Sequence, residues 1–373
     1  MVVHALFPDS ILKPVGGLGE QVGQIYYRLK DKVDFRIFGF PQSEELDGYT
    51  PVPNFMTQMY NGSFLSLTNQ INYFYHSVKS KDKPDLIHAM DWSTYVAGHF
   101  AAKYWEVPLV VSMNLSTIGL RENGIFYCND PQSIDGFNLQ FTHELSEELG
   151  LDSADSIIHV SNAYANKFKE HEKKSTIIPN GIDLKFWEGK AQPYDFPGKN
   201  KRKIVYIGRF ALMKGIVQLC EASIPEDVDL YFVGDSRGGE EICWQAIQKK
   251  CNDSNVYYLG FLRDQEKKSV MQSADAVIIP SIHEPFGIVG LEAMAAGTMI
   301  ISSFVDGISE YLTDEIGIYT DVNADSLSKV LEQFSNMNQQ EIDKRVSKGL
   351  DKVQNYSWDK IVDQYLNLYN SLI

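Results

Sequence analysis

The sequence predicts an α/β protein made of two Rossmann-like domains, each a doubly wound parallel sheet with helices on both faces. Short runs of buried-strand character alternate with helical patterns along nearly the whole chain, and such alternation produces parallel sheets covered by helices. The chain has 373 residues, which is more than one compact core usually holds, so two domains are expected.

Strand candidates are short apolar runs bounded by polar residues or glycine. In the first half of the chain they cover residues 2–7, 35–40, 86–89, 109–113, 156–160 and 175–178. In the second half they cover residues 203–207, 229–233, 256–259, 276–279 and 299–302. Helical spacing separates them, for example over residues 19–29, 95–104 and 142–150.

The domain boundary is predicted near the middle of the chain. Residues 186–200 contain two prolines, two glycines and charges of both signs, which is typical of a linker. We therefore predict an N-terminal domain over residues 1–185, a linker over 186–200 and a C-terminal domain over 201–357. Residues 358–373 show a helix with one apolar stripe, and the pattern alone does not say what that stripe packs against.

The composition is that of an ordinary globular protein, with 44% hydrophobic and 22% charged residues. A net charge of −15 repels nucleic acid and anionic membranes, so neither is expected as a general partner. No apolar run is long enough for a membrane-spanning helix, and the amino end lacks a signal-peptide pattern. The four cysteines form no CxxC pair and suggest reduced thiols. We therefore expect a cytoplasmic protein without stable membrane insertion.

Glu284 and Glu292 lie eight positions apart, with a turn and the start of a helix between them. Pro285 fixes one backbone angle and Gly287 frees another, so the chain can bend and expose amide groups. A helix start beside a glycine turn is an anion site, and the carboxylates can accept hydrogen bonds from sugar hydroxyls. The alternative is a surface turn that leads into a helix.

A basic motif follows the strand candidate at 203–207. Arg209 offers a planar fork of donors and Lys214 a compact charge, and together they suit a diphosphate. Such groups gather at the carboxyl ends of strands in open α/β sheets. The alternative is a solvated basic pair at the end of a strand.

A glycine-rich loop follows the first strand candidate. Gly16, Gly17 and Gly19 precede a helical pattern, and a unit of strand, glycine loop and helix lets backbone amides approach a pyrophosphate. The run is neither a full GxGxxG nor a Walker loop, so this motif is weak by itself.

Together these motifs resemble the retaining GT-B glycosyltransferases, and most closely the branch that holds bacterial and archaeal glycogen synthases. The similarity runs along nearly the whole chain in the family's order. The matching residues are 16–18, 88–92, 160–161, 178–183, 208–209, 214–215, 281, 284–287 and 292–294. The resemblance implies the GT-B fold, in which two domains face each other across a cleft and the C-terminal helix packs back on the N-terminal domain.

The resemblance also implies a hexosyltransferase that moves a sugar, glucose above all, from ADP-glucose or UDP-glucose to a glycan with retention of configuration. Arg209 and Lys214 match the diphosphate-binding pair, and Glu284 matches the glutamate that holds a donor-sugar hydroxyl. These three are the expected catalytic residues. Glu292 matches the residue that binds the nucleotide ribose, although a glutamate there could instead interact with the helix dipole. The other expected donor-binding residues are Gly16, Gly17, Asp91, Gly208, Leu262, Phe286, Gly287 and Ile288.

Asp91 and Asn114 each follow a strand candidate of the first half. Asp91 matches a position on the donor-sugar side, but a helix N-cap is nearly as good an interpretation. Asn114 lies where the family often has a histidine. Its amide can bind a sugar hydroxyl but cannot usefully take up a proton, so we assign it to the acceptor side. Pro14 stands where glycogen synthases usually carry a lysine, which leaves the acceptor open.

The competing interpretations keep the fold and change the function. One is a transferase for a small-molecule, lipid-linked or protein acceptor. Another is a sugar-nucleotide epimerase, and a third is a non-catalytic glycan-binding or regulatory protein, against which the intact charged motifs argue. Neither a metal nor a cofactor is expected. Residues 227–229 have the spacing of an Asp-x-Asp metal motif but are better explained as a turn before a strand.

Overall fold

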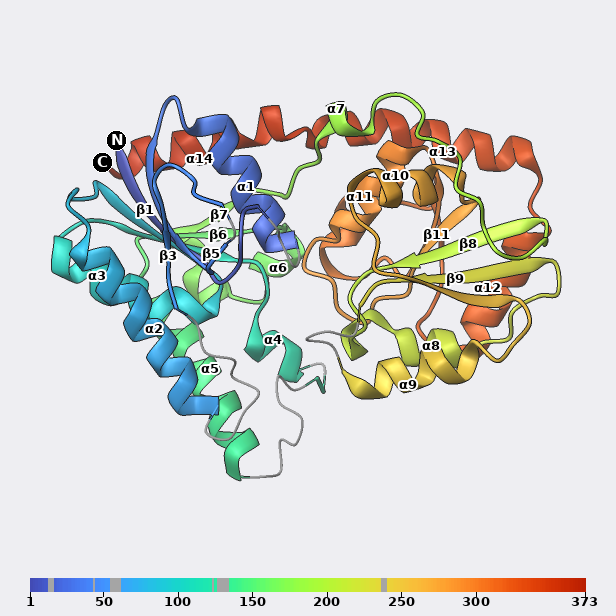
Figure 1. The fold of residues 1–373 in the computed structure, drawn as a ribbon, viewed down its shortest axis with the longest axis horizontal. Coiled ribbons are helices and arrows are strands. Elements are labelled where there is room, and N and C mark those ends of the chain that lie inside the picture. Colours follow the sequence, from blue (N-terminus) through green and yellow to red (C-terminus); the bar gives the residue numbers. More distant parts are fainter. Residues whose placement is uncertain (13–16, 43, 54–61, 123, 126–133, 236–239) are drawn as a thin grey trace. The chain divides into compact units, whose positions relative to one another are not determined.

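The computed structural model describes residues 1–12, 17–42, 44–53, 62–122, 124–125, 134–235 and 240–373. The chain divides into two compact units (Figure 1). Unit 1 consists of Met1–Asn180 and Trp358–Ile373, and unit 2 of Gly181–Ser357. Each unit holds one parallel sheet with helices against it, so the predicted fold class of two doubly wound α/β domains is confirmed.

The sheet of unit 1 has seven parallel strands in the order β3-β2-β1-β4-β5-β6-β7. Six of these follow the 3-2-1-4-5-6 order of a Rossmann sheet. Val3 in β1 lies opposite Phe35 in β2 and Leu86 in β4, which fixes the register at the point where the strand order reverses. The strands are β1 (Val2–Leu6), β2 (Asp34–Gly39), β3 (Tyr49–Pro51), β4 (Leu86–Met90), β5 (Leu109–Met113), β6 (Ser156–His159) and β7 (Ser175–Ile177).

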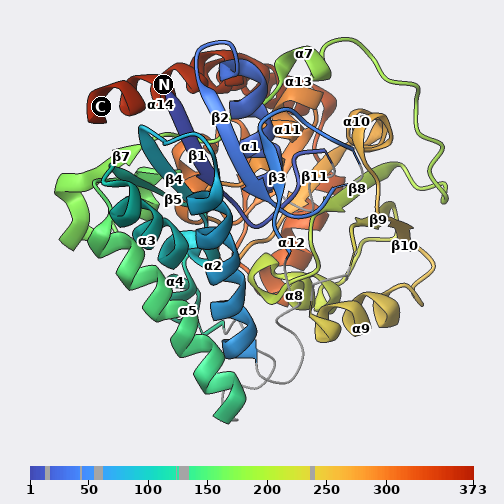
Figure 2. The same ribbon diagram turned by 60° about the vertical axis from the view of Figure 1, so that its left-hand side comes forward.

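Helices cover both faces of this sheet. In Figures 1 and 2, α1 and α14 lie on one face and α2, α3 and α5 on the other. The helices of unit 1 are α1 (Gly17–Leu29), α2 (Gly62–Lys79), α3 (Tyr95–Trp105), α4 (Thr117–Glu122), α5 (Ile134–Ser153), α6 (Asn162–Ala165) and α14 (Trp358–Leu372), with 3-10 turns η1 (Trp92–Thr94) and η2 (Lys169–Lys174).

The C-terminal helix α14 packs into the core of unit 1 although unit 2 precedes it in the chain. Trp358 and Tyr369 are fully buried among residues of β1, β2 and α1. The hydroxyl of Tyr369 lies 2.7 Å from Nδ1 of His88, and the hydroxyl of Ser112 lies 2.7 Å from Nε2 of the same ring. The side-chain Nε2 of Gln21 donates to the hydroxyl of Tyr365 at 3.0 Å. The apolar stripe of this helix therefore faces the sheet.

The sheet of unit 2 has six parallel strands in the order β10-β9-β8-β11-β12-β13, again the Rossmann order. Its strands are β8 (Arg202–Ile207), β9 (Val228–Val233), β10 (Val256–Gly260), β11 (Ala276–Ile279), β12 (Met299–Ser302) and β13 (Gly317–Tyr319). Its helices are α7 (Leu184–Trp187), α8 (Ile216–Glu221), α9 (Glu241–Lys250), α10 (Asp264–Ser273), α11 (Ile288–Ala296), α12 (Ala324–Ser335) and α13 (Gln339–Val353), with 3-10 turns η3 (Leu212–Lys214), η4 (Asp306–Glu310) and η5 (Gln354–Tyr356).

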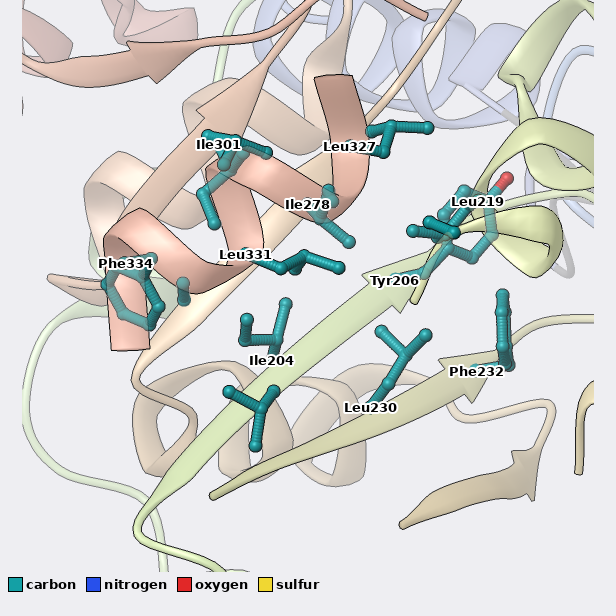
Figure 3. Close-up of a cluster of buried hydrophobic side chains, with 14 of the residues drawn as sticks. Ile204, Tyr206, Leu219, Leu230, Phe232, Ile278, Ile301, Leu327, Leu331 and Phe334 are labelled. Atoms are coloured by element: carbon teal, nitrogen blue, oxygen red, sulfur yellow. The ribbon is translucent and has the colours of Figure 1, made fainter. Parts of the chain in front are cut away.

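One face of this second sheet carries an apolar core shared with α8, α9 and α12. Figure 3 shows part of it. The labelled side chains are Ile204, Tyr206, Leu230, Phe232, Ile278 and Ile301 from strands, and Leu219, Leu327, Leu331 and Phe334 from helices. Removing these surfaces from water supplies the main driving force for folding of the unit.

Each predicted strand is present, with both ends within one residue of the prediction. The short strands β3 and β13 were not predicted. Residues 181–185, which the prediction placed before the linker, belong to unit 2. The amide of Ile182 donates to the carbonyl of Tyr356 at 2.8 Å, which ties the first residues of unit 2 to its last ones. Within the described part of the chain, no helix is both long enough and apolar enough to cross a membrane.

Candidate active site

Three loops of unit 2 meet at one edge of its sheet. They follow β8, β11 and β12, which lie side by side in the sheet, and the carboxyl ends of parallel strands share one edge. This edge is where open α/β sheets bind ligands. It carries most of the residues that the sequence singled out.

A lysine–glutamate pair joins the first two loops. Nζ of Lys214, in η3, lies 2.5 Å from Oε2 of Glu284, and the hydroxyl of Ser281 donates to the same oxygen at 3.2 Å. Glu284 is only 8% exposed, and these partners replace the hydrogen bonds to water that a buried carboxylate loses. The predicted residues Lys214 and Glu284 thus come together in one charged cluster.

Gly215 explains how these loops can approach so closely. Its φ is +66°, and a Cβ at this position would lie 1.9 Å from the carbonyl oxygen of Pro280. Only glycine fits there without moving the backbone. The carbonyl of Met213 also accepts hydrogen bonds from the amides of Ile282 at 2.8 Å and His283 at 3.2 Å. The Lys214 loop and the Glu284 loop therefore form one rigid unit.

The third loop, which follows β12, holds the Glu284 turn in place through the side chain of Asp306. The amide of Glu284 donates to Oδ2 of Asp306 at 3.1 Å, and Nδ1 of the fully buried His283 lies 2.6 Å from the same oxygen. Gly307 donates its amide to the carbonyl of Glu284 at 3.1 Å. Asp306 has a φ of +45°, a left-handed conformation that aspartate tolerates better than most residues.

The Glu284 turn leads directly into helix α11. Gly287 caps this helix with a φ of +87°, and a Cβ there would lie 2.6 Å from the side chain of Ile308. The first amides of α11, starting at Ile288, lack carbonyl partners inside the helix. Phe286 is buried, with its ring 5.4 Å from that of Tyr311. Its side chain therefore belongs to the core, and only its backbone could contact a ligand.

Glu292 has its own lysine. It lies in the second turn of α11, and its carboxylate accepts a hydrogen bond from Nζ of Lys267 on α10. Both side chains are mostly buried. The two glutamates eight positions apart are therefore each matched by a lysine from another element, Glu284 by Lys214 and Glu292 by Lys267.

Arg209 follows β8 at the same edge of the sheet. Its side chain is exposed, its Nη2 lies 4.0 Å from the sulfur of Met213, and it forms no ion pair with any residue that the structure describes. Burial raises the pKa of Glu240, and the charge of Arg209 counteracts that rise. The guanidinium is therefore a cation available to a ligand at the end of β8.

Gly208 and Leu262 flank the same edge. Gly208 directly follows β8 and donates its amide to the carbonyl of Val233 at 3.1 Å. Leu262 follows β10 and is half-buried against the smaller apolar cluster on the other face of the sheet.

In unit 1 the predicted residues follow β1, β4 and β5, which are neighbours in that sheet. Gly16 lies outside the described residues, and Gly17 is the exposed first residue of α1. Asp91 has a φ of +78° and caps η1, where its carboxylate accepts from the amide of Ser93 at 3.1 Å and from its hydroxyl at 3.0 Å. The N-cap interpretation of Asp91 therefore describes its present contacts.

Asn114 directly follows β5. Its Nδ2 is buried and donates no hydrogen bond to a described residue. A buried amide donor without an acceptor is uncommon, so the Nδ2 group of Asn114 can donate a hydrogen bond to a ligand.

The Asp-x-Asp segment has structural contacts. Both carboxylate oxygens of Asp227 accept from the hydroxyl of Ser335 at 2.7 Å. Asp229 lies in β9 and accepts from the amide and the side chain of Asn200, both at 3.0 Å. Among the described residues, no group of three or more histidine, cysteine or acidic side chains is arranged to hold a metal ion.

Sequence reasoning missed Lys267, His283 and Asp306. Asp306 could have been suspected, because it follows a strand next to the one before Glu284 and so reaches the same edge of the sheet. No local pattern marks Lys267, whose partner is known only once α10 and α11 are packed together.

The protein has two Rossmann-like units, and the carboxyl-end edge of the second sheet carries both cationic side chains and glutamates. This combination is typical of GT-B glycosyltransferases. Residues 193–350 match the family model described as "Glycosyl transferases group 1", and residues 15–186 match "Glycosyltransferase Family 4". "Uncharacterized glycosyltransferase MJ1607" of Methanocaldococcus jannaschii is 31% identical over 308 residues, covering 77% of this chain and 75% of that protein. The chain belongs to the group 1 glycosyltransferases, as the sequence motifs predicted.

Other similar proteins carry more specific names. An alpha-maltose-1-phosphate synthase of Mycobacterium tuberculosis is 25% identical over 386 residues, covering 96% of each chain. Sucrose-phosphate synthase from Thermosynechococcus elongatus has the same fold, with a TM-score of 0.81 over 100% of this chain and 98% of that one at 21% identity. Anabaena Alr3699/HepE in complex with UDP-glucose gives a TM-score of 0.74 at 20% identity, covering 100% of both chains.

Proposed function

We propose that this protein is a retaining glycosyltransferase that moves a glucosyl group from a nucleotide-sugar to a glycan, in the manner of a glycogen synthase. The observation that carries the proposal is the Lys214–Glu284 pair, supported by Ser281, next to the first amides of α11. A buried carboxylate, a cation and a helix N-terminus provide partners for a sugar hydroxyl and for a diphosphate in one place.

In this proposal the cations stabilise the departing nucleoside diphosphate. Lys214, Arg209 and the amides of Gly287 and Ile288 hold its phosphate oxygens while the bond from the anomeric carbon to the phosphate oxygen breaks. The acceptor hydroxyl forms the new bond on the same face of the sugar, and its proton passes to the departing phosphate oxygen. Glu284 accepts a hydrogen bond from a hydroxyl of the transferred sugar and so orients it.

The remaining site residues bind the rest of the substrates. Glu292 accepts the ribose hydroxyls, and Leu262 lies against the base. The family resemblance assigns Gly16 and Gly17 to the diphosphate and Asp91 to the donor sugar, and these assignments stay predictions. Asn114 binds an acceptor hydroxyl with its buried amide. The charge of the leaving group is met by side chains and backbone, so the reaction as proposed uses neither a metal nor a cofactor.

The favoured donors are ADP-glucose and UDP-glucose. A solved structure with this fold contains UDP-glucose, and another, starch synthase IV of Arabidopsis thaliana, contains ADP and acarbose. We further propose that the enzyme works in the cytoplasm, where its thiols would remain reduced.

A second candidate acceptor is a sugar phosphate. Two proteins similar to this chain over nearly its whole length are named for such chemistry, alpha-maltose-1-phosphate synthase and sucrose-phosphate synthase. By contrast, the match to a glycogen synthase of Mycobacterium tuberculosis covers 61% of this chain and 54% of that protein. The proposed nucleotide-sugar donor is the same whether the acceptor is a glycan or a sugar phosphate.

A donor panel followed by a transfer assay tests the proposal. A true donor at a hundred times its dissociation constant should stabilise the protein by about 2.7 kcal/mol, which a thermal-shift assay detects. The best donor is then combined with maltooligosaccharides and, separately, with glucose 1-phosphate, and release of nucleoside diphosphate is measured. Release that depends on an added acceptor supports the transferase and identifies the acceptor class, whereas binding without turnover would support a regulatory protein.

The Lys214→Ala enzyme provides the residue-level test. Loss of one charged donor to the leaving group should lower kcat by roughly a hundredfold or more. Lys249→Ala, on the exposed side of α9, is the matched control and should keep wild-type turnover. Unchanged turnover in Lys214→Ala would refute the role of Lys214.

A further inference from the structure

The outer face of α2 and α3 in unit 1 has an unusual set of exposed side chains. From Ser66 onward in α2 and throughout α3, each exposed residue is apolar, aromatic or lysine. They are Leu67, Ile71, Tyr75 and Lys79 on α2, and Phe100, Lys103 and Tyr104 on α3. Ile71 is 63% exposed and Tyr104 59%. A contiguous exposed patch of large apolar side chains is typical of an interaction site.

These residues form one continuous surface. Leu67, Ile71 and Tyr75 recur every four positions and therefore lie on one side of α2. The half-buried Phe74 connects them to α3, since its ring lies 6.2 Å from that of Phe100 and 6.5 Å from that of Tyr104. We call this surface the α2–α3 apolar face.

The two helices themselves carry no negative side chain, although the exposed Glu106 caps the end of α3. Neither the 18 residues of α2 nor the 11 residues of α3 include an aspartate or a glutamate, although the whole chain has 49 acidic against 34 basic residues. Lys79 and Lys103 flank the apolar side chains, and Nζ of Lys79 lies 5.8 Å from the centre of the Tyr75 ring. His76 and His99 lie on the same helices, but burial lowers the pKa of each, so the positive charge comes from the lysines. A locally cationic face thus stands out on an acidic protein.

We propose that the α2–α3 apolar face docks unit 1 reversibly on the surface of an anionic phospholipid bilayer. Aliphatic and aromatic side chains enter the boundary between headgroups and acyl chains, while lysines extend to the phosphates. The docking is peripheral, because both helices remain packed on the sheet. The inference goes beyond the proposed function and does not depend on which sugar or acceptor the enzyme uses.

Charge distinguishes a bilayer from a second copy of the chain. A symmetric dimer through this face would set the surface against itself. Lys79 and Lys103 would then meet other cations with no carboxylate on either helix to pair with. Anionic headgroups supply the missing negative charge. The acidic remainder of the protein opposes binding only within a Debye length of about 8–10 Å at physiological salt, so we expect docking in one orientation that weakens as salt rises.

Vesicle co-sedimentation with the full-length protein tests this inference. Vesicles of phosphatidylcholine containing about one third phosphatidylglycerol should pellet the wild-type protein at low salt, whereas pure phosphatidylcholine vesicles should not. The charge variant Lys79→Glu with Lys103→Glu should lower the vesicle partition coefficient by roughly tenfold or more. The apolar variant Ile71→Ser with Tyr104→Ser should lower it comparably, since it removes the inserted side chains.

Matched controls come from unit 2. Ile242 on α9 is 55% exposed, and Lys249 on the same helix is exposed, so Ile242→Ser with Lys249→Glu makes the same kinds of change elsewhere. This control should bind vesicles as the wild type does. All variants should keep the wild-type melting temperature and donor-induced thermal shift, which separates failure of docking from failure of the fold or of the proposed donor site.

Three results would overturn the proposal. One is no excess binding to the phosphatidylglycerol vesicles, and another is an equal loss in the α9 control. The third is a concentration-dependent dimer, seen by sedimentation velocity without lipid, that disappears in the Ile71→Ser, Tyr104→Ser variant. That result would identify the face as a contact between copies of the chain.

Discussion

At the scale of single residues, Lys267 is the charged neighbour of Glu292. Its ammonium group donates to one carboxylate oxygen of Glu292 and leaves the other oxygen for the ribose of the proposed donor. We expect Lys267→Met to raise KM for the donor by roughly tenfold, which is the effect of losing one charged hydrogen bond. The turnover number should change little, because a ribose contact exists equally in the bound substrate and in the transition state. Steady-state kinetics with varied donor measure both constants.

Two further variants make the Lys267 prediction specific. Lys267→Arg retains the charge and should restore most of the donor affinity, while Lys249→Met on the exposed side of α9 should behave like the wild type. A lower turnover number with unchanged KM in Lys267→Met would contradict the ribose assignment, since it would mean that the contact matters only in the transition state.

Asp306 supports the Glu284 turn through the amide of Glu284 and the ring of His283. Asp306→Ala removes both contacts and places alanine at a φ of +45°, which alanine adopts reluctantly. We expect the free energy of unfolding to fall by about 1–3 kcal/mol, as for other buried groups left without a partner. Turnover should fall by roughly tenfold or more, because Glu284 loses its fixed position. Asp306→Asn keeps an acceptor oxygen and should retain most of the stability in a urea titration.

Measuring both the unfolding free energy and the turnover of Asp306→Ala shows whether Asp306 matters for activity or only for folding. An Asp306→Ala enzyme that is less stable but turns over at the wild-type rate would mean that the third loop contributes only to folding. In that case the position of Glu284 would be set by Lys214 and Ser281 alone.

The residues of the candidate site were predictable to different degrees, for physical reasons. Lys214 and Glu284 could be found because each follows a strand, and neighbouring strands of a parallel sheet end at one edge. Lys267 lies inside a helix with no special residue beside it, so only packing reveals its partner. The opposite case is Phe286, whose motif position suggests a ligand contact although its ring is buried in the core.

At the scale of elements, α14 joins unit 1 through a buried hydrogen-bonded network. The hydroxyl of Tyr369 meets one nitrogen of His88, and Ser112 meets the other. Tyr369→Phe leaves that nitrogen buried without a partner, so we expect the unfolding free energy of unit 1 to fall by about 1–3 kcal/mol. Urea denaturation measures this loss. Tyr75→Phe, which removes an exposed hydroxyl, should change the stability by less than about 0.5 kcal/mol, and an equal effect in both variants would contradict the role of the network.

The strands that the sequence predicted are those that contain or adjoin a clear apolar run. Central strands such as β5 and β11 are fully buried apolar runs, and their bounds were predicted correctly. The edge strands β3 and β13 have three residues each and contain Pro51 and Gly317, so no continuous apolar run marks them. The equally short β7 was predicted because its run ends in the apolar pair Ile177 and Ile178. The packing of α14 on unit 1 could not be predicted from the sequence pattern either. Its stripe predicted a buried face, but the partner of that face lies more than 300 residues away in the chain and was suggested only by family resemblance.

At the scale of the whole molecule, buried histidines are concentrated in unit 1. His4, His88, His143 and His159 are all buried there. Burial lowers the pKa of His88 and His143 to about 3, and that of His4 and His159 to about 4. Unit 2 has a single histidine in its sequence. The two units should therefore respond differently to acid.

Unit 1 should lose stability as the pH falls below about 6.5, the usual pKa of histidine. The unfolded chain then takes up protons that the folded unit cannot accept, and the loss continues until the pH reaches the folded pKa values of about 4 and about 3. Glu147 acts in the opposite direction, because burial raises its pKa to about 7 and the folded unit binds that proton more readily between about pH 7 and 4.5. Four groups outweigh one, so the net effect is destabilising.

A difference of one pKa unit between the folded and unfolded states corresponds to about 1.4 kcal/mol. The four histidines together therefore oppose folding in acid by an amount of the same order as the 5–15 kcal/mol, roughly, that stabilises a typical domain, and we expect unit 1 to unfold at a higher pH than unit 2. The protein can be equilibrated at a series of pH values and then pulse-labelled by hydrogen exchange at one fixed pH, with mass spectrometry of peptides from each unit. Peptides from β1, β4 and β5 should lose protection at a higher pH than those from β8, β11 and β12. Simultaneous loss in both units would mean that acid unfolding is not controlled by these histidines, and that the carboxylates spread over both units decide it instead.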